Sequence, residues 1–433
     1  MRRSSALAPL AVIALALALR AQNVWHVRSD ALPGGDGSSW SSAFDSLDSA
    51  LSAARASVAQ DEIRIARGRY RPATRTNPAD PRSATFLVPS GTKLQGGWNP
   101  FTNAPPPAGL AVATQLDGGL GSVGAAYHVV TIEMFNQPTD PRAELANLTV
   151  THGRANGVAS GDVDGGGVYL PAATSSVRLD TCLVVGNSAA RDGGGLYAYC
   201  INVQLKWSRF ADNQAGGSGG GAWVKASTFL SGTSFARNSA TDGGGYVGLK
   251  PFIPTTAGTV HLRINGCRFK ANEATNLGGA MHFPGTGINN AANYRILNCT
   301  FSDNQAGVAG GALSGPLGGV GWIINSILWG DSAPLDSELT LGIPVDYSIV
   351  DGPGVYPGSV GATNMNFDPL LNGDQSLASN TSPAIDASSG LFTPQDILDL
   401  DGDGITAEPL PLDMARAPRL VGNAMDLGAY EHP

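Results

Sequence analysis

The sequence predicts an all-β fold, a right-handed parallel β-helix in which one chain coils into a solenoid. Three observations predict it: an Asn that recurs once per coil, apolar side chains at fixed distances before that Asn, and a glycine cluster shortly after it. The Asn residues are separated by 26, 25, 34 and 32 residues. They are Asn187, Asn213, Asn238, Asn272 and Asn304.

Three columns of side chains precede the recurring Asn. The position three before it holds Val or Phe, the position five before it holds Cys, Ser or Thr, and the position eight before it holds Leu or Ile. The first two columns are two positions apart, so they lie on the same face of one strand and point inward. A single coil cannot bury such a face alone, and stacked coils can. The columns are Val184, Phe210, Phe235, Phe269 and Phe301; Cys182, Ser208, Thr233, Cys267 and Cys299; and Leu179, Leu205, Leu230, Ile264 and Ile296.

Two other repeat folds fit less well. A leucine-rich repeat would show helical spacing after a Leu-rich strand, and the unit is too short for a four-stranded propeller blade. In a β-helix the Asn tolerates left-handed backbone geometry, and its amide can bond the turn of the next coil. The glycines permit positive φ and close backbone approach. Gly153 and Asp331 occupy the Asn position in weaker outer copies.

Composition and periodicity divide the chain into four parts. An amphipathic helix with Phe44, Leu47, Leu51, Ala54 and Val58 on one face is predicted to close the first coil, because an open solenoid end needs a cap. Ser41 or Ser42 can cap this helix. The parts are a signal peptide (1–22), an N-terminal cap with the helix (23–61), the parallel β-helix (62–350) and a Pro- and Asp-richer C-terminal cap (351–433).

The first residues predict export. Arg2 and Arg3 precede an apolar run from Leu7 to Leu19, and Ala21 offers a cleavage point, as in a secretory signal peptide. An uncleaved N-terminal anchor is the alternative. No other apolar run is long enough to cross a bilayer. We therefore expect a secreted or cell-surface protein without a transmembrane span once the signal is removed.

Charge and cysteine content argue against a nucleic-acid-binding protein and against a zinc-binding protein. Net charge is −8 and charged residues make up 14% of the chain, with no basic stripe to neutralise phosphates, so no nucleic-acid partner is expected. The chain has 4 Cys and no CxxC motif, which argues against a zinc site. Cys182, Cys267 and Cys299 stand in the inward column and are expected to act as small apolar side chains. A disulfide within the column is the alternative; Cys200 lies outside it.

The repeats resemble a known group of proteins. "FADN", "FARN", "FKAN" and "FSDN", each followed by a glycine cluster such as "GGGAW" or "GGALS", are similar to the repeats of polymorphic outer-membrane proteins of the pectin-lyase-like β-helix superfamily. The later motifs "SPAIDASSG" and "DLGAYE" resemble a choice-of-anchor Q domain. The resemblance implies a bacterial surface protein. It defines an architecture and does not imply one activity.

One acidic motif predicts a metal site. Asp399, Asp401 and Asp403 alternate in "DLDGDG", and alternating carboxylates with a Gly are how oxygen-rich calcium loops are built. The twelfth position of an EF-hand is Leu410 here, so the motif is not an EF-hand. The alternative is an acidic turn whose aspartates cap backbone amides.

Two further sets of residues are candidates for binding or catalysis. Asp162 and Asp164, with Arg191 nearby in sequence, could form the acidic pair of a glycosidase or the site of a polysaccharide lyase; turn residues are the alternative. Tyr197 and Trp223 are predicted to point outward, where they could stack on sugar rings or on a partner protein. The alternative is packing against loops.

These observations favour a non-catalytic exported or cell-envelope scaffold, adhesive in character, that binds glycans or proteins. The alternative function is a polysaccharide lyase or glycoside hydrolase acting along the solenoid on an extracellular polysaccharide. An enzyme needs acids, or acids and an Arg, that converge within one or two coils. The matched columns contain small, apolar and Asn side chains instead. No cofactor other than calcium is indicated.

Overall fold

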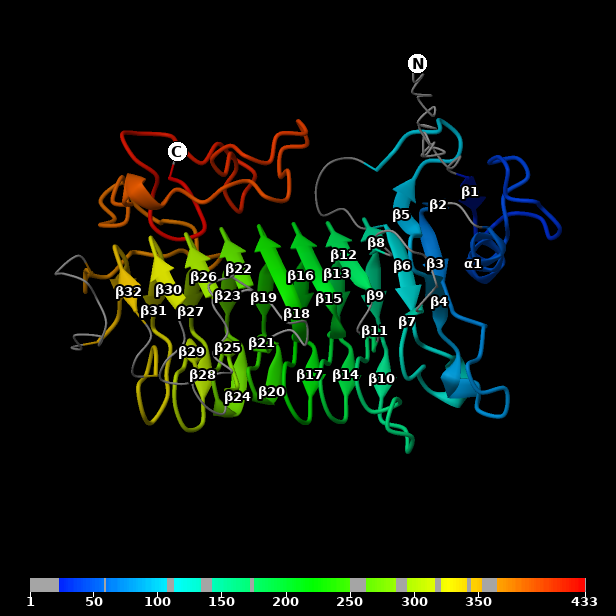
Figure 1. Ribbon diagram of the computed structural model, residues 1–433, viewed down its shortest axis with the longest axis horizontal. Helices are drawn as coiled ribbons and strands as arrows, with labels where there is room; N and C mark the ends of the chain where they lie inside the picture. The colour runs from blue at the N-terminus through cyan, green and yellow to red at the C-terminus, as the bar shows by residue number, and fades with distance from the viewer. Residues whose placement is uncertain are drawn as a thin grey trace, which may run out of the picture.

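The computed structural model shows a parallel β-helix, as the sequence predicts (Figure 1). Three long sheets run along its axis, and every pairing between their strands is parallel in the described residues. The structure describes residues 23–57, 60–106, 113–133, 142–171, 175–249, 262–285, 294–315, 321–340, 344–352 and 364–432. The predicted signal peptide lies outside these residues, as does Val58 of the predicted helix.

The first sheet has 17 strands in two rows that follow each other within a coil. Two long strands, β15 (Leu196–Lys206) and β18 (Ala222–Ser231), pass through both rows and join them. Row one is completed by β4 (Phe86–Pro89), β7 (Val130–Glu133), β11 (Val168–Leu170), β21 (Tyr246–Leu249), β25 (Met281–His282) and β29 (Leu313–Ser314). Row two is completed by β1 (Val24–Val27), β2 (Glu62–Ala66), β5 (Lys93–Trp98), β8 (Arg142–Ala146), β12 (Ser176–Asp180), β22 (Leu262–Asn265), β26 (Tyr294–Leu297), β30 (Gly321–Ile324) and β32 (Val345–Asp346).

The other two sheets complete each coil. The second sheet, of 10 strands, contains β3 (Gly68–Tyr70), β6 (Thr114–Asp117), β9 (Thr149–Thr151), β13 (Leu183–Val185), β16 (Arg209–Ala211), β19 (Ser234–Ala236), β23 (Arg268–Lys270), β27 (Thr300–Ser302), β31 (Ile327–Trp329) and β33 (Ile349–Val350). The third, of 6 strands, contains β10 (Arg154–Ala155), β14 (Ser188–Ala189), β17 (Gln214–Ala215), β20 (Ser239–Asp242), β24 (Glu273–Leu277) and β28 (Gln305–Ala306).

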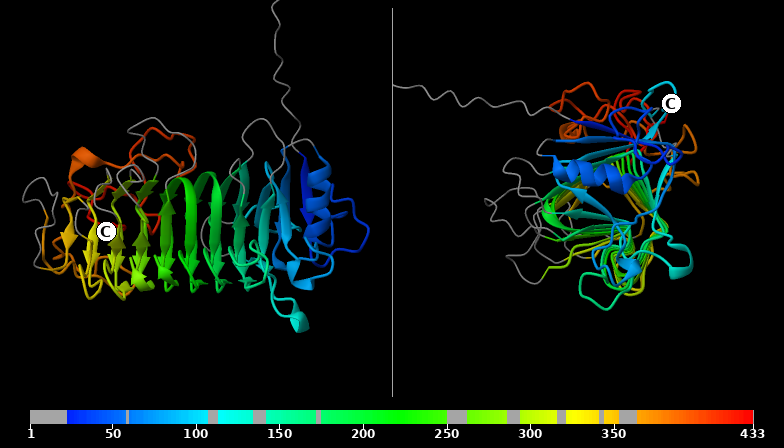
Figure 2. Two further views of the ribbon diagram at one scale, coloured as in Figure 1. Left: turned by 60° about the horizontal axis from the view of Figure 1, so that its bottom comes forward. Right: turned by 90° about the vertical axis from the view of Figure 1, so that its right-hand side faces the viewer.

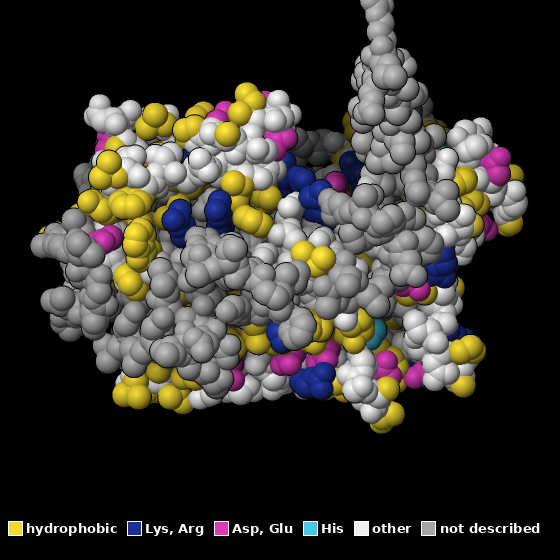
Figure 3. All heavy atoms as spheres, viewed as in Figure 1, with side chains coloured by type: hydrophobic (Ala, Val, Ile, Leu, Met, Phe, Trp, Pro, Cys, Tyr) yellow, Lys and Arg dark blue, Asp and Glu magenta, His cyan; other side chains and the backbone are white. Residues whose placement is uncertain are grey.

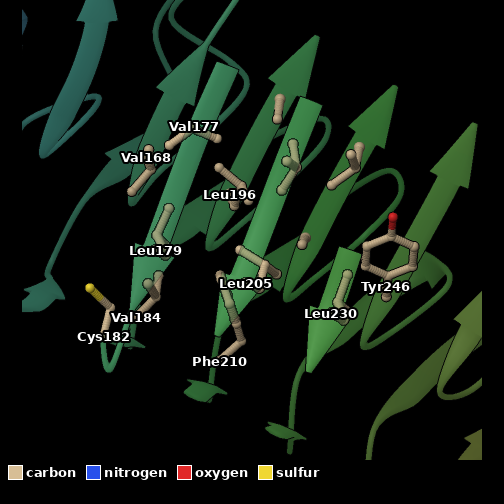
Figure 4. Packing of buried hydrophobic residues seen from close by; sticks show 14 of the residues in the cluster. Val168, Val177, Leu179, Cys182, Val184, Leu196, Leu205, Phe210, Leu230 and Tyr246 are labelled. Atoms are coloured by element: carbon tan, nitrogen blue, oxygen red, sulfur yellow. The ribbon is translucent and has the colours of Figure 1, made fainter. Parts of the chain in front are cut away.

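The core confirms the repeat alignment residue by residue. Each Phe of the inward column pairs with its counterpart on the next coil, and the rings stack with centroids 4.9, 5.1 and 4.8 Å apart. Figure 4 shows side chains from successive coils filling the space between the sheets. All four cysteines are buried and free, so the expectation of small apolar side chains holds and no disulfide forms.

The recurring Asn forms a continuous hydrogen-bonded ladder inside the turn. Asn213 donates from its backbone N and from Nδ2 to Oδ1 of Asn238, at 3.1 and 3.0 Å. Its Nδ2 also donates to the carbonyl oxygen of Val184, at 2.9 Å. At the far end Asp331 replaces Asn and accepts both bonds from Asn304, at 2.7 Å each. The ladder therefore satisfies buried backbone groups that no strand pairing reaches.

The backbone geometry of this turn corrects one expectation. The Asn itself is not left-handed; the residue before it has positive φ, for example Asp212 at 55°. The Asn instead uses its side chain for the ladder. The left-handed residues at this corner are Gly186, Asp212, Arg237, Ala271, Asp303 and Gly330.

The N-terminal end is covered by helix α1 (Leu47–Ala56), which lies across the first coils in the end-on view of Figure 2. Its N-cap is Ser46, whose side chain accepts from the backbone N of Ser49, rather than Ser41 or Ser42. Phe44 therefore precedes the helix and pairs with Val27. Within the described residues, short 3₁₀ helices lie at Pro81–Ser83, Gly121–Val123 and Gly390–Phe392.

The described C-terminal residues 364–432 run back along the side of the coils, above the strand ends in Figure 1. Trp207, which precedes Leu400 by 193 residues in the sequence, donates from Nε1 to the Leu400 carbonyl oxygen at 3.2 Å. A buried ion pair, Arg419 Nε to Glu431 Oε1 at 3.2 Å, holds this segment together internally. In the described part of the chain, no helix has the length and apolar character to span a membrane.

Candidate functional site

A line of aromatic rings runs along the outside of row one. Tyr169, Tyr197 and Trp223 occupy matching positions on β11, β15 and β18. The Tyr197 and Trp223 rings are stacked with centroids 4.5 Å apart, and the Tyr169 and Tyr197 rings lie 5.5 Å apart. His128 extends the line by stacking on Tyr169 at 4.3 Å. We call these four residues the aromatic stripe.

The rings of the aromatic stripe differ in their burial and protonation. His128 is buried and bonds to the Gly165 carbonyl oxygen through Nδ1, at 2.9 Å, and burial lowers its pKa, so it is neutral. Tyr169, Tyr197 and Trp223 are partly exposed. Burial and the nearby Asp164 charge raise the pKa of Tyr197 to about 12, so its hydroxyl stays protonated and can donate a hydrogen bond.

Sequence reasoning identified only two members of the stripe. It aligned the copies on Asn, and the coil that contains Tyr169 has Gly153 at that position. Alignment on the glycine clusters finds it, since "GGGVY", "GGGLY" and "GGGAW" place an aromatic residue at the same distance from the glycines. Tyr199, two residues beyond Tyr197, adds a further ring that Lys225 contacts at 5.1 Å.

Carboxylates border the stripe at the corner before three of the glycine clusters. Asp164 accepts from the backbone N of Asp192 at 3.1 Å, and Asp192 accepts from the backbone N of Ser218 at 2.7 Å. Asp242 continues the pattern by accepting from Leu277 N at 3.2 Å. Figure 3 shows acidic and basic side chains close together in this lower part of the face, around β17. These aspartates tie one coil to the next.

The proposed catalytic residues are brought together only in part. Asp164 is buried and forms a two-pronged ion pair with Arg191, whose Nε lies 2.8 Å from Oδ1 and whose Nη2 bonds Oδ2. Its oxygens are thus occupied by Arg191 and by the backbone. Asp162 lies in the same loop and its carboxylate makes no hydrogen bond or ion pair with the residues described. This arrangement supports a structural role for Asp164 and Arg191.

The acidic motif of the C-terminal segment gathers more carboxylates than the sequence indicated. One group contains Asp396, Asp399 and Asp401, and a second contains Asp401, Asp403 and Glu408; within each, potential ligand oxygens lie within 4.8 Å of one another. Asp399, Asp401 and Asp403 also accept backbone N–H groups within the loop, at 3.1, 3.3 and 2.7 Å. Both functions that the motif suggested, turn capping and cation binding, are therefore sterically compatible.

Asp396 is the residue that distinguishes this cluster from an ordinary turn. It is fully buried, and its Oδ2 accepts from Leu400 N at 2.6 Å while Oδ1 has no partner in the described structure. Burial, followed by the charges of Asp401 and Asp399, raises its pKa. A hard cation would satisfy the free oxygen and offset this repulsion.

Comparison with known proteins finds a repeat of a known family in one part of the chain. Residues 298–316 match the family model of the Chlamydia polymorphic membrane protein repeat. The matched segment contains Phe301 and Asn304, so the repeat resemblance is confirmed there. A search of curated proteins found no match to the chain. The family takes its name from the polymorphic membrane proteins of Chlamydia. The chain thus contains a repeat similar to that of the polymorphic membrane proteins, built into a parallel β-helix.

Proposed function

We propose that this protein is an exported, non-catalytic scaffold of the bacterial surface, adhesive in character, which binds glycans through the aromatic stripe. The observation that carries the proposal is the stacked, partly exposed series Tyr169, Tyr197 and Trp223 on three successive coils. Because the rings stack on one another, the stripe presents their edges in a regular row, an apolar ridge against which an extended sugar chain can pack, and the Tyr hydroxyls add polar contacts. A protein partner that covers the same stripe is the alternative ligand.

The test measures binding of the purified protein to polygalacturonate, alginate and glucans. Trp223→Ala and Tyr197→Ala are expected to weaken binding of the recognised polymer about tenfold, because each interrupts the row of aromatic rings that the polymer contacts. Phe367→Ala is the matched control, since Phe367 is exposed but lies in the C-terminal segment. Unchanged affinity in both stripe variants would contradict the proposal.

The second candidate function is a polysaccharide lyase or glycoside hydrolase. Asp162 is the observation in its favour. Its carboxylate is unpaired within the described residues, and it lies in the loop that precedes β11, the strand that carries Tyr169. The same polymers are assayed for new reducing or unsaturated ends. We expect none; turnover that Asp162→Ala abolishes would replace the scaffold with the enzyme.

We also propose that the carboxylate cluster around Asp399, Asp401 and Asp403 binds calcium, with Asp396 as an additional ligand. The support is the unpartnered buried oxygen of Asp396 and the proximity of its neighbours. Calcium prefers carboxylate and carbonyl oxygens in flexible geometry, which this loop offers. Its role would be to fasten the C-terminal segment to the coils.

A further inference from the structure

A concave site lies on another face of the molecule from the aromatic stripe. It is a pocket of 310 Å³ between row two of the first sheet and the C-terminal segment. Its floor consists of outward side chains of β22, β26 and β30, and its wall consists of residues 391–395 and Ile397. This volume is at the lower end of the range for small-molecule sites, so it suits one ring with its substituents.

Two arginines stand side by side on the floor of the pocket. Arg263 and Arg295 are register partners on adjacent strands, and Trp322 is the next residue in the same row. No Asp or Glu lines the pocket, and neither arginine forms an ion pair with the described residues. The chain segments 250–261, 286–293 and 316–320, which precede these three strands in the sequence, contain no acidic residue.

Such a pair needs a compensating negative charge. Like charges directly opposite each other on neighbouring strands are destabilising. The guanidinium of Arg263 lies 5.9 Å from the Phe229 ring, a contact that orients it without neutralising it. Guanidinium groups pair best with oxyanions, which they bind through two parallel hydrogen bonds. An oxyanion between the two arginines satisfies both requirements.

Unsatisfied polar atoms mark the same pocket. Asn265, which lines it, is only 3% exposed, and its Oδ1 has no hydrogen-bond partner in the described structure. Its Nδ2 donates to the Gln395 carbonyl oxygen at 3.4 Å, which leaves Oδ1 as the free acceptor. The Nε of Arg263 is also buried without a partner. A buried acceptor without a donor is costly, so a ligand hydroxyl or N–H is the expected complement.

The pocket also has an aromatic ring on its floor and another on its wall. Trp322 is 46% exposed, and its ring meets that of Phe392 edge to face with centroids 6.4 Å apart. In Figure 3 basic side chains border hydrophobic ones beneath the C-terminal segment, over the upper parts of these strands. An exposed Trp next to two arginines combines a stacking surface with charge.

We propose that this pocket binds a small hydroxylated ring that carries one oxyanion. The oxyanion lies between Arg263 and Arg295, the ring lies against Trp322, and a hydroxyl donates to Asn265 Oδ1. The site is independent of the aromatic stripe, because it is built on different strands and on the C-terminal segment.

Titration calorimetry with three probes tests the proposal on the full chain. Glucuronate has the ring, the hydroxyls and the carboxylate; glucose lacks the charge, and benzoate lacks the hydroxyls. Glucuronate is expected to bind most tightly, and added salt is expected to weaken it. Arg295→Gln should weaken glucuronate binding about tenfold, since it removes a charged hydrogen bond. Arg237→Gln is the matched control, because that exposed arginine pairs with Asp212 on another face.

Three further results complete the test. Arg295→Gln should leave the melting temperature unchanged or raise it, because it relieves repulsion; a structural arginine would lower it. Trp322→Ala provides a second loss-of-binding variant, and Trp223→Ala should leave glucuronate binding unchanged. The proposal is overturned if glucuronate does not bind, if glucose binds equally well, or if Arg295→Gln and Trp322→Ala both bind like the wild type.

Discussion

A single carboxylate, that of Asp331, ends the Asn ladder. Asp331 is buried beside Glu338, whose Oε1 accepts from Asp331 N at 3.1 Å. Burial, reinforced by the neighbouring carboxyl in the case of Glu338, raises the pKa of both groups. In the Asn residues of the ladder, Nδ2 donates to a carbonyl oxygen. The corresponding atom of Asp331 is Oδ2, which cannot donate in the ionised carboxylate and has no hydrogen-bond partner in the described structure.

Asp331→Asn is therefore expected to stabilise the protein at high pH. A carboxyl whose folded-state pKa is raised contributes full stability below its unfolded pKa, about 4, and loses it as pH rises through the folded value. The wild type should lose stability over that window, and the variant should lose less. We expect a gain of about 2 kcal/mol in unfolding free energy at about pH 8, and a smaller gain at about pH 5.

Urea unfolding at the two pH values measures this difference. Asp336→Asn is the control, since Asp336 is exposed five residues away and should change neither value. Equal stability of Asp331→Asn and the wild type at high pH would contradict the assignment.

The element that makes the coils stackable is the corner formed by each glycine cluster. Its first glycine has positive φ, 59° at Gly243, and its second is crowded by the next coil. A Cβ on Gly244 would collide with the carbonyl oxygens of both Glu273 and Gly279. The third position is more tolerant, because Ala280 and Ala312 occupy it in later coils.

Gly244→Ala is expected to lower the unfolding free energy by about 2–3 kcal/mol, because overpacking forces the backbone of adjacent coils apart. Gly245→Ala is the neighbouring control, and its cost should be smaller, because one backbone atom, the Ala280 carbonyl oxygen, lies 2.6 Å from the added Cβ and the next atom, Asn272 Cγ, lies 3.2 Å away. Chemical denaturation of the two variants compares them directly. A larger loss for Gly245→Ala would show that the third position, not the second, limits coil spacing.

At the scale of the whole molecule, the C-terminal segment connects distant coils and carries the carboxylate cluster that we propose as a calcium site. Lys206 donates to the Asp399 carbonyl oxygen, and the guanidinium of Arg416 lies 4.8 Å from the Trp207 ring. An apolar cluster lies between the C-terminal segment and the coils and consists of Trp207, Leu398, Leu400 and Leu410. A cation in this loop would stabilise the docked segment, because ligands that bind only the native state raise its stability.

Calcium is therefore expected to raise the melting temperature of the wild type, and a chelator should reverse the shift. Asp399→Asn with Asp401→Asn should abolish the effect of calcium, whereas Asp336→Asn should preserve it. Differential scanning calorimetry with and without calcium measures the shift. A wild-type melting temperature that is insensitive to calcium would count against the site.

The sequence by itself determined the coil. Phe210, Asn213 and the glycines after them predicted the inward column, the ladder and the corner, because each coil contacts its neighbours in the same register and the pattern is repeated in the chain. Local signals also placed the N-terminal helix. The alignment on Asn missed Tyr169, because the coil that contains Tyr169 has Gly153 in place of the Asn. The residue with left-handed backbone geometry is Asp212 and not, as the sequence had predicted, Asn213.

Only the tertiary structure decided where the non-repeating residues lie. Asn265 meets Gln395 across 130 residues of chain, and no periodicity relates the two. The course of the C-terminal segment along the coils, the burial of Asp396 and the pocket with Arg263 and Arg295 all depend on such contacts. A solenoid repeats its short-range contacts in its sequence, whereas a segment that docks on its side is placed by the shape and charge of a surface that exists only after the coils have formed.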